Sequence, residues 1–208
     1  DVRVAVRAGD FDSFHQAAQR VYQYFRVPPV LGNARAAVAK PSYALRTPAC
    51  GLVAPTHHTY GEAAAFVVMG DVRYPVDKAQ VQSAVYLPDP ANPGGPPIPV
   101  KYGIPDPFRS WQADLYLPMG AVEVTPSREA LSYTPATVAA VRAAFTRAHD
   151  EAAAELSRQI GDAPDLWSAR FAARDLAKFQ AFGTSLQWKG REASAVLRFN
   201  SDHAPPPG

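Results

Sequence analysis

The residues with the clearest chemical potential in this chain are three consecutive polar residues, Ser127, Arg128 and Glu129. They follow an apolar, strand-like segment at 120–124 and precede a long helical pattern. A helix that opens at this turn would present free backbone N–H groups, which attract anions. The positive end of a helix disfavours a cation, so an arginine there indicates that an anion lies close by. That anion is either the carboxylate of Glu129 or a phosphate that another domain supplies.

Two interpretations of Arg128 follow. In the first, Ser127 caps the helix and Arg128 pairs locally with Glu129, an exposed ion pair that contributes about 0–1 kcal/mol. In the second, the guanidinium is a bidentate donor to the terminal phosphate of a nucleotide, as an arginine finger is. The chain has no Gly-x-x-x-x-Gly-Lys-Ser/Thr loop, no Gly-x-Gly-x-x-Gly turn and no Asp-x-Gly-x-Gly sequence. We therefore expect this chain alone to bind ATP poorly.

Other polar groups give weaker signals. His57 and His58 are adjacent, so in a strand they would point to opposite faces and would not bind one metal ion. We expect no metal site. The helix-spaced cations Arg170, Arg174 and Lys178 indicate either a solvated face or a contact with an anionic partner. Four acidic residues are typical of helix caps and solvated helix faces: Glu151, Glu155, Asp162 and Asp165.

Composition limits the class of protein. With 208 residues, of which 47% are apolar, the chain can build a core, and a net charge of +2 argues against nucleic acid as a partner. The single cysteine, Cys50, excludes an internal disulfide, and we expect it to be a small, apolar-like residue. No apolar run reaches the ~18 residues of a membrane span, and no signal peptide opens the chain. We expect a soluble intracellular piece of a longer polypeptide, because Asp1 is not Met and the tail is linker-like.

The elements that must position the Ser-Arg-Glu turn follow from the apolar periodicity. Strands are predicted at 2–7, at 43–53 with an interruption at Pro48, at 63–76 with a bend at Gly70, at 113–117 and at 121–124. A helix is predicted at 11–26, capped by Asp10 or Asp12 and ended by Pro28-Pro29. The segment 88–107 contains eight prolines and three glycines, which predicts a loop.

The C-terminal part of the chain is predicted to be mostly helical. Thr134-Pro135 is a good helix start, and apolar residues from Val138 to Ile160 keep a three–four spacing that also leaves packing against a second copy open. A second helix is predicted at 166–182, and closing strands at 185–189 and 193–199. The element order predicts an α+β protein with a mixed sheet packed by helices. The predicted domains are 1–135, then a helical pair with closing strands at 136–200, and a linker-like tail at 201–208.

Two segments carry a family resemblance. The sequence GAVEVTPSREAL at 120–131 resembles a motif in the middle domain of the ninety-kilodalton heat-shock chaperones, where a Gly-Val-Val-Asp segment precedes Asn-Leu-Ser-Arg-Glu-x-Leu. It is more similar still to the phage rIIA-like proteins, distant members of the same GHKL ATPase group, which have a Ser-Arg-Glu-x-Leu-x-Tyr turn. The sequence VMGDVRYPV at 68–76 resembles their Met-Gly-x-Val-x-Tyr-Pro stretch. The resemblance covers roughly residues 1–140.

The resemblance implies a transducer domain with a fold like that of ribosomal S5 domain 2. It implies that Arg128 contacts the γ-phosphate of ATP, bound with Mg²⁺ by an upstream domain of the same polypeptide, while Glu129 orients the guanidinium and Ser127 caps the helix. The implied biology is phage lysis inhibition and superinfection exclusion in the host cytoplasm, with the membrane involved only indirectly. The alternative is a non-catalytic module for protein–protein interaction or homodimer formation. By itself the chain is not expected to be an enzyme.

Overall fold

The computed structural model describes residues 5–31, 37–54, 64–87, 98–102, 104–182 and 187–193. The chain divides into two compact units, Asp1–His149 and Asp150–Gly208. The division falls inside the long helix α3 (Pro135–Gly161). The boundary predicted from the sequence, between residues 135 and 136, lies at the first turn of that helix.

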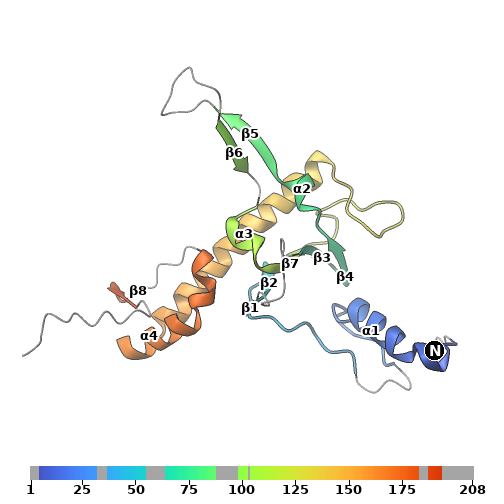
Figure 1. The fold of residues 1–208 in the computed structure, drawn as a ribbon, viewed down its shortest axis with the longest axis horizontal. Helices are drawn as coiled ribbons and strands as arrows, with labels where there is room; N and C mark the ends of the chain where they lie inside the picture. Colours follow the sequence, from blue (N-terminus) through green and yellow to red (C-terminus); the bar gives the residue numbers. More distant parts are fainter. Residues whose placement is uncertain are drawn as a thin grey trace, which may run out of the picture. The chain divides into compact units, whose positions relative to one another are not determined.

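The first unit is built on a five-stranded mixed sheet with strand order β1-β2-β7-β3-β4 (Figure 1). β7 lies in the middle of the sheet, antiparallel to β2 and parallel to β3. The five strands are β1 (Leu45–Arg46), β2 (Cys50–Val53), β3 (Ala65–Met69), β4 (Val72–Pro75) and β7 (Gln112–Leu117). This arrangement confirms the predicted α+β class with a mixed sheet.

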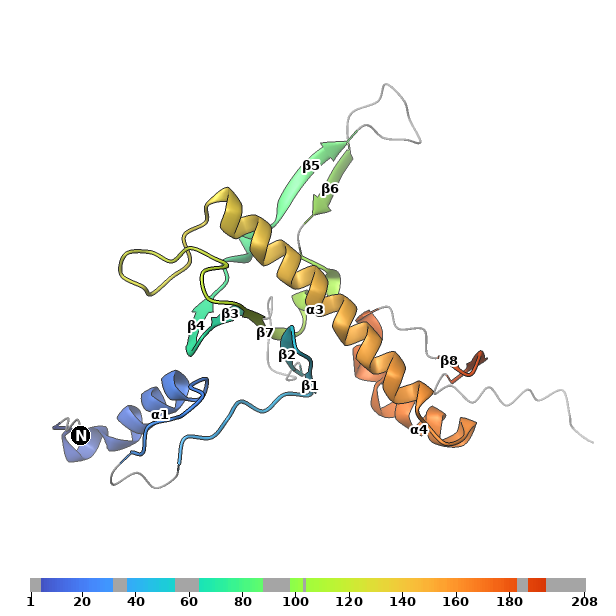
Figure 2. The ribbon, with the colours of Figure 1, turned by 180° about the vertical axis from the view of Figure 1, so that it is seen from behind.

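One face of the sheet packs against the first part of α3, which runs along β2, β7 and β3 (Figure 2). Because side chains alternate along a strand, every second strand residue belongs to this core. Its buried members include Cys50, Leu52, Ala65, Val67, Ala113 and Leu115 from the strands and Val141, Phe145 and Ala148 from the helix. The Cys50 thiol is fully buried and donates to the carbonyl of Ala148 at 3.8 Å, which confirms that this cysteine is a core residue.

β3 and β4 form a hairpin, where the sequence predicted one strand with a bend. Met69 pairs with Val72, so the turn consists of Gly70 and Asp71 alone. Gly70 has a φ of 64°, a conformation that glycine adopts at little cost. The glycine therefore reverses the chain rather than bending it.

The segment before the sheet contains α1 (Phe11–Tyr22), preceded by the 3₁₀ turn η1 (Ala8–Asp10). The predicted helix is present but ends four residues earlier than position 26, and Asp10 lies at its N-cap without a side-chain hydrogen bond. The predicted strand at 2–7 is wrong at residues 5–7, which lead into η1, since Gly9-Asp10 favours a turn. Residues 2–4 lie outside the described part.

A separate hairpin, β5 (Ser83–Leu87) with β6 (Ile98–Tyr102), follows the short helix α2 (Lys78–Val81). The predicted loop at 88–107 is therefore wrong at 98–102, and also at its last two residues, which begin η2 (Asp106–Arg109). Pro99 is compatible with β6 because this strand belongs to a two-stranded sheet, where one edge of each strand needs no ladder partner. Residues 88–97 lie outside the described part.

The second unit contains the last part of α3, α4 (Leu166–Asp175), η3 (Ala177–Phe182) and a small hairpin of β8 (Gln187–Trp188) and β9 (Arg191–Glu192). Its core includes Ile160, Ala169, Ala173 and Ala193. The predicted helical pair is present, although 177–182 are 3₁₀ rather than α-helical. β8 matches the strand predicted at 185–189, whereas the strand predicted at 193–199 has only residue 193 described, which is not in a strand. The tail lies outside the described part.

Within the described ranges, none of the helices combines the length and the apolar content that crossing a membrane requires.

Candidate functional site

The Ser-Arg-Glu segment lies in a loop between β7 and α3. An antiparallel bridge between Val124 and Leu131 closes this loop. Inside it, the backbone N–H of Thr125 donates to the carbonyl of Ala130 at 2.9 Å, and the N–H of Arg128 donates to the carbonyl of Thr125 at 2.8 Å. The backbone of the loop is thus held by its own hydrogen bonds, with Arg128 in the turn.

The predicted role of Ser127 as a helix cap is wrong. α3 begins at Pro135, and Thr134 caps it: the Thr134 hydroxyl accepts from the N–H of Thr137 at 3.3 Å. Proline suits the first helical turn, because its φ is already helical and its missing N–H would have no helical partner. The Ser127 hydroxyl instead contacts the Thr125 hydroxyl at 3.1 Å. The argument that a helix N-terminus attracts an anion to Arg128 therefore does not apply.

Arg128 nevertheless has unusual geometry. Its φ is 60°, a left-handed conformation that few residues other than glycine adopt. Arg128 and Glu129 are both exposed. In the part of the chain that the structure describes, no ion pair or side-chain hydrogen bond joins the Arg128 guanidinium to a carboxylate, that of Glu129 included. The donors of the guanidinium are therefore open to an anion from outside the chain, and the roles predicted for Arg128 and Glu129 stay predictions.

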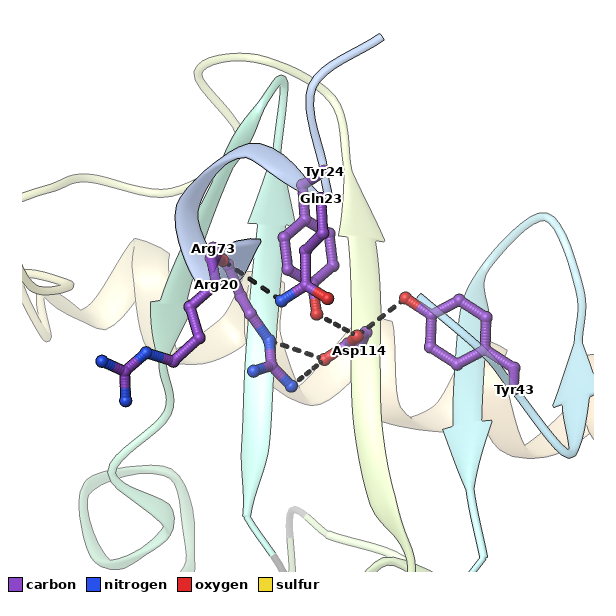
Figure 3. A network of polar contacts seen from close by, with 6 residues as sticks. All are labelled: Arg20, Gln23, Tyr24, Tyr43, Arg73 and Asp114. Carbon is purple, nitrogen blue, oxygen red and sulfur yellow. Dashed lines mark hydrogen bonds and ion pairs between the residues drawn. The ribbon is translucent and has the colours of Figure 1, made fainter. Parts of the chain in front are cut away.

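A second polar group lies on the sheet face opposite α3 and centres on Asp114 of β7 (Figure 3). The Asp114 side chain is 1% exposed. Arg73 of β4 donates to its Oδ1 from Nε at 2.9 Å and from Nη2 at 2.6 Å. The hydroxyls of Tyr24 and Tyr43 each donate to Oδ2 at 2.8 Å. We call Asp114, Arg73, Tyr24 and Tyr43 the Asp114 network.

Strand register explains how these side chains reach Asp114. Gly51 of β2 and Phe66 of β3 are its direct neighbours across the sheet. Arg73 passes over Phe66, with its guanidinium carbon 3.3 Å from the ring centroid. Tyr43 passes over Gly51, where a Cβ atom would lie 2.4 Å from the tyrosine ring. Only glycine at position 51 leaves room for this tyrosine.

The electrostatics of the network favour a structural role. Burial, with further contributions from Asp114, raises the pKa of Tyr24 and of Tyr43 above the usual tyrosine value of 10.0. Both hydroxyls therefore stay protonated near neutral pH and remain donors. The Asp114 charge is balanced by Arg73, and removing Arg73 would leave the buried carboxylate uncompensated. Both carboxylate oxygens already accept hydrogen bonds, so this group is not a candidate for reaction chemistry.

Sequence reasoning missed the Asp114 network because its members are far apart along the chain. Arg73, Tyr43 and Tyr24 are 41, 71 and 90 residues from Asp114. The available signal was an aspartate in the apolar strand pattern 113–117, together with a glycine in the neighbouring strand. Neither identifies a partner by itself.

The remaining candidates have ordinary surroundings or lie outside the described part. Glu155 and Asp162 both pair with Arg158, each at 2.7 Å. Asp165 caps α4 by accepting from the N–H of Ser168 at 2.7 Å, as predicted for a helix cap. Arg174 and Lys178 are exposed and Arg170 is half-buried. His57 and His58 lie outside the described residues.

No protein-family model matches the chain, and neither the curated proteins nor the solved structures include a match to it.

Proposed function

We propose that this chain is the transducer domain of a phage rIIA-like ATPase of the GHKL group, with an S5-domain-2-like fold. In this proposal Arg128 contacts the γ-phosphate of ATP, which an upstream domain of the same polypeptide binds with Mg²⁺. One observation carries it: an exposed guanidinium, without an ion-pair partner among the described residues, in a closed loop that follows the middle strand of the sheet. Such an arginine has no evident structural purpose, whereas a terminal phosphate would use its donors.

The chemistry of an arginine and a terminal phosphate suits the proposal. A guanidinium is always charged and can donate two parallel hydrogen bonds to one phosphate. When bound, ATP with Mg²⁺ supplies the phosphoryl group that is transferred. Arg128 would add positive charge where negative charge increases in the transition state.

The loop is also connected to α3, which a transducer needs. The backbone N–H of Glu123 donates to the hydroxyl of Thr137 at 3.0 Å, and the Thr134 hydroxyl donates to the Glu123 carboxylate at 3.1 Å. These hydrogen bonds join the start of the loop to the first turn of α3. If a phosphate pulled on Arg128, the load would therefore reach the first turn of α3 as well as the loop.

The direct test is ATP turnover by the polypeptide that carries this chain together with its ATP-binding domain. We expect Arg128→Ala to lower turnover at least tenfold, about 1.4 kcal/mol of transition-state stabilisation. Arg128→Asn is the sharper variant, because asparagine tolerates a positive φ and so keeps the loop conformation while removing the charge. Both variants should fold, since the side chain is exposed.

The matched control is Arg20→Ala, which removes another exposed arginine, on α1. It should leave ATP turnover unchanged. Unchanged turnover in folded Arg128→Ala and Arg128→Asn proteins would reject the phosphate role.

A second candidate function is a protein–protein interaction module without catalysis. Its support comes from a different surface, the exposed aromatic side chains Trp167 and Phe171 of α4. This function does not involve Arg128, so an experiment that rejects one proposal leaves the other unaffected.

A further inference from the structure

The loop around Arg128 consists of a paired base and an exposed four-residue tip. The base is an antiparallel pairing of residues 123–125 with residues 130–132, which one bridge and two backbone hydrogen bonds hold together. The tip is residues 126–129, all of them exposed. An exposed tip has no core to hold it, so contacts inside the loop must fix its conformation.

The backbone of Arg128 has a conformation that costs free energy. Residues 125–128 form a turn in which the N–H of Arg128 donates to the carbonyl of Thr125 at 2.8 Å, with Pro126 as the second residue. Proline is favoured at the second position of the commonest turn of this kind, and glycine at the fourth. Here the fourth residue is Arg128, with a φ of 60°. A left-handed residue other than glycine persists only where the surrounding structure enforces it.

Thr125 makes the contacts that enforce this conformation. Its carbonyl accepts from the N–H of Arg128, and its hydroxyl lies 3.1 Å from the hydroxyl of Ser127. In the described part of the chain, these are the hydrogen bonds that the tip residues make. The same Thr125 hydroxyl donates to the carbonyl of Ala130 at 3.3 Å and accepts from its N–H at 3.4 Å. One side chain therefore joins the tip to both arms of the base.

A single arrangement of protons satisfies all of these contacts. A hydroxyl has one proton to donate and two lone pairs that accept. Because the Thr125 proton goes to the carbonyl of Ala130, the Ser127 hydroxyl must donate to Thr125. The proton of Ser127 is then used inside the loop. The guanidinium of Arg128 remains as the side-chain donor that the tip offers to an anion.

We infer that Thr125 is a positioning residue for Arg128, whose hydroxyl keeps the guanidinium in the conformation that contacts the γ-phosphate. This inference rests on the proposed function of Arg128 and adds a second residue to it. Thr125 acts without touching the nucleotide, by limiting the conformations of the tip before the phosphate arrives. The apparent affinity for a ligand falls with the fraction of molecules that hold the competent conformation. Loss of the hydroxyl therefore weakens the phosphate contact although the cation is still present.

The first test measures the conformation of Arg128 in this chain by NMR and needs no ATP. A positive φ brings the amide hydrogen of a residue close to its own Hα, which gives a strong intraresidue nuclear Overhauser effect. We expect Thr125→Val, which has nearly the same shape but no hydroxyl, to weaken this effect at Arg128. Thr125→Ser, which keeps the hydroxyl, should preserve it.

The matched control is Thr146→Val. It removes another threonine hydroxyl that donates to a backbone carbonyl at 3.3 Å, on the surface of α3, and should leave the effect at Arg128 unchanged. Circular dichroism verifies that each variant is folded. An unchanged effect at Arg128 in folded Thr125→Val protein would overturn the inference, whatever the outcome with ATP.

The second test measures the affinity of a non-hydrolysable ATP analogue and of ADP for the proposed longer polypeptide. We expect Thr125→Val to weaken binding of the analogue about threefold and to leave ADP binding unchanged, while Thr125→Ser restores the affinity. In a double-mutant cycle, Thr125→Val should have no further effect once Arg128→Asn is present. A residue that only stabilised the fold would weaken both nucleotides, or would act equally in both backgrounds.

The outcomes separate this inference from the proposed function. If Arg128→Asn weakens binding of the analogue but Thr125→Val does not, the positioning role is overturned and the proposed function stands. Additive effects of the two substitutions would also overturn the positioning role. If neither substitution weakens binding of the analogue, the proposed function fails together with this inference.

Discussion

The close approach of Tyr43 to Gly51 shows that a polar network in this fold depends on a single glycine. Tyr43 lies before β1, yet its hydroxyl reaches Asp114 on the third strand of the sheet. It can do so only by lying over β2, and Gly51 is the position that it covers. The absence of a side chain at position 51 is therefore a requirement of the Asp114 network.

The first prediction concerns Gly51→Ala. The new Cβ atom would lie 2.4 Å from the Tyr43 ring, so the ring must move and its hydrogen bond to Asp114 must lengthen or break. We expect the free energy of unfolding, measured by urea denaturation, to fall by about 1–3 kcal/mol.

The control is a double-mutant cycle with Tyr43→Ala. Without the ring, Gly51→Ala should no longer destabilise the fold and should raise the free energy of unfolding by about 0.4–1 kcal/mol, because alanine restricts the unfolded chain. If Gly51→Ala changed the free energy of unfolding equally in the wild-type protein and in Tyr43→Ala, the ring would not lie over Gly51.

The sequence identified the Ser-Arg-Glu segment but not the Asp114 network, for a physical reason. Ser127, Arg128 and Glu129 are consecutive, so their local pattern could be recognised even though the predicted helix cap was wrong. The Asp114 network consists of side chains that meet only after the strands have paired. Their register depends on β2, β3, β4 and β7 together, and no short stretch of sequence contains it.

At the scale of elements, the start of α3 decides how the Ser-Arg-Glu loop is interpreted. Sequence patterns offered two starts, one at Ser127 and one at Thr134-Pro135, and the structure has the second. The long three–four periodicity from Val138 to Ile160 predicted the helix to within one residue of its end at Gly161. β6 was missed, since the prolines of its segment outweighed a short strand that pairs only with β5.

The second prediction compares the two candidate caps. Thr134→Ala removes the hydroxyl that caps α3 and joins it to Glu123, so it should lower the free energy of unfolding by about 1 kcal/mol. Ser127→Ala should change it by less than about 0.5 kcal/mol, because Ser127 is exposed in the loop. Thermal denaturation of both variants measures the difference. If Ser127→Ala lowered the free energy of unfolding more than Thr134→Ala does, Ser127 and not Thr134 would be the cap of the helix.

At the scale of the whole molecule, the general class followed from the sequence but the pairing of strands did not. Alternating apolar residues and the order of elements are enough to predict an α+β protein with a mixed sheet. They do not specify that β7 lies between β2 and β3, because that order depends on contacts between distant segments.

The third prediction is a loss of stability at alkaline pH. The pKa values of Tyr24 and Tyr43 are raised in the folded chain by burial and by Asp114. Their contribution is therefore complete below the unfolded-state value of 10.0 and is lost as the pH rises above it. Urea denaturation at pH about 8 and about 11 should show this decrease, and Tyr43→Phe should reduce it. An equal decrease in wild type and variant would contradict the role of Tyr43.

The central claim is that Arg128 binds a γ-phosphate. It is tested most directly by the affinities of a non-hydrolysable ATP analogue and of ADP for the proposed longer polypeptide, in which an upstream domain binds ATP. We predict that Arg128→Asn weakens binding of the analogue about tenfold, a loss of about 1.4 kcal/mol, and leaves ADP binding unchanged. Equal effects on the two nucleotides, or no effect on either, would contradict the claim.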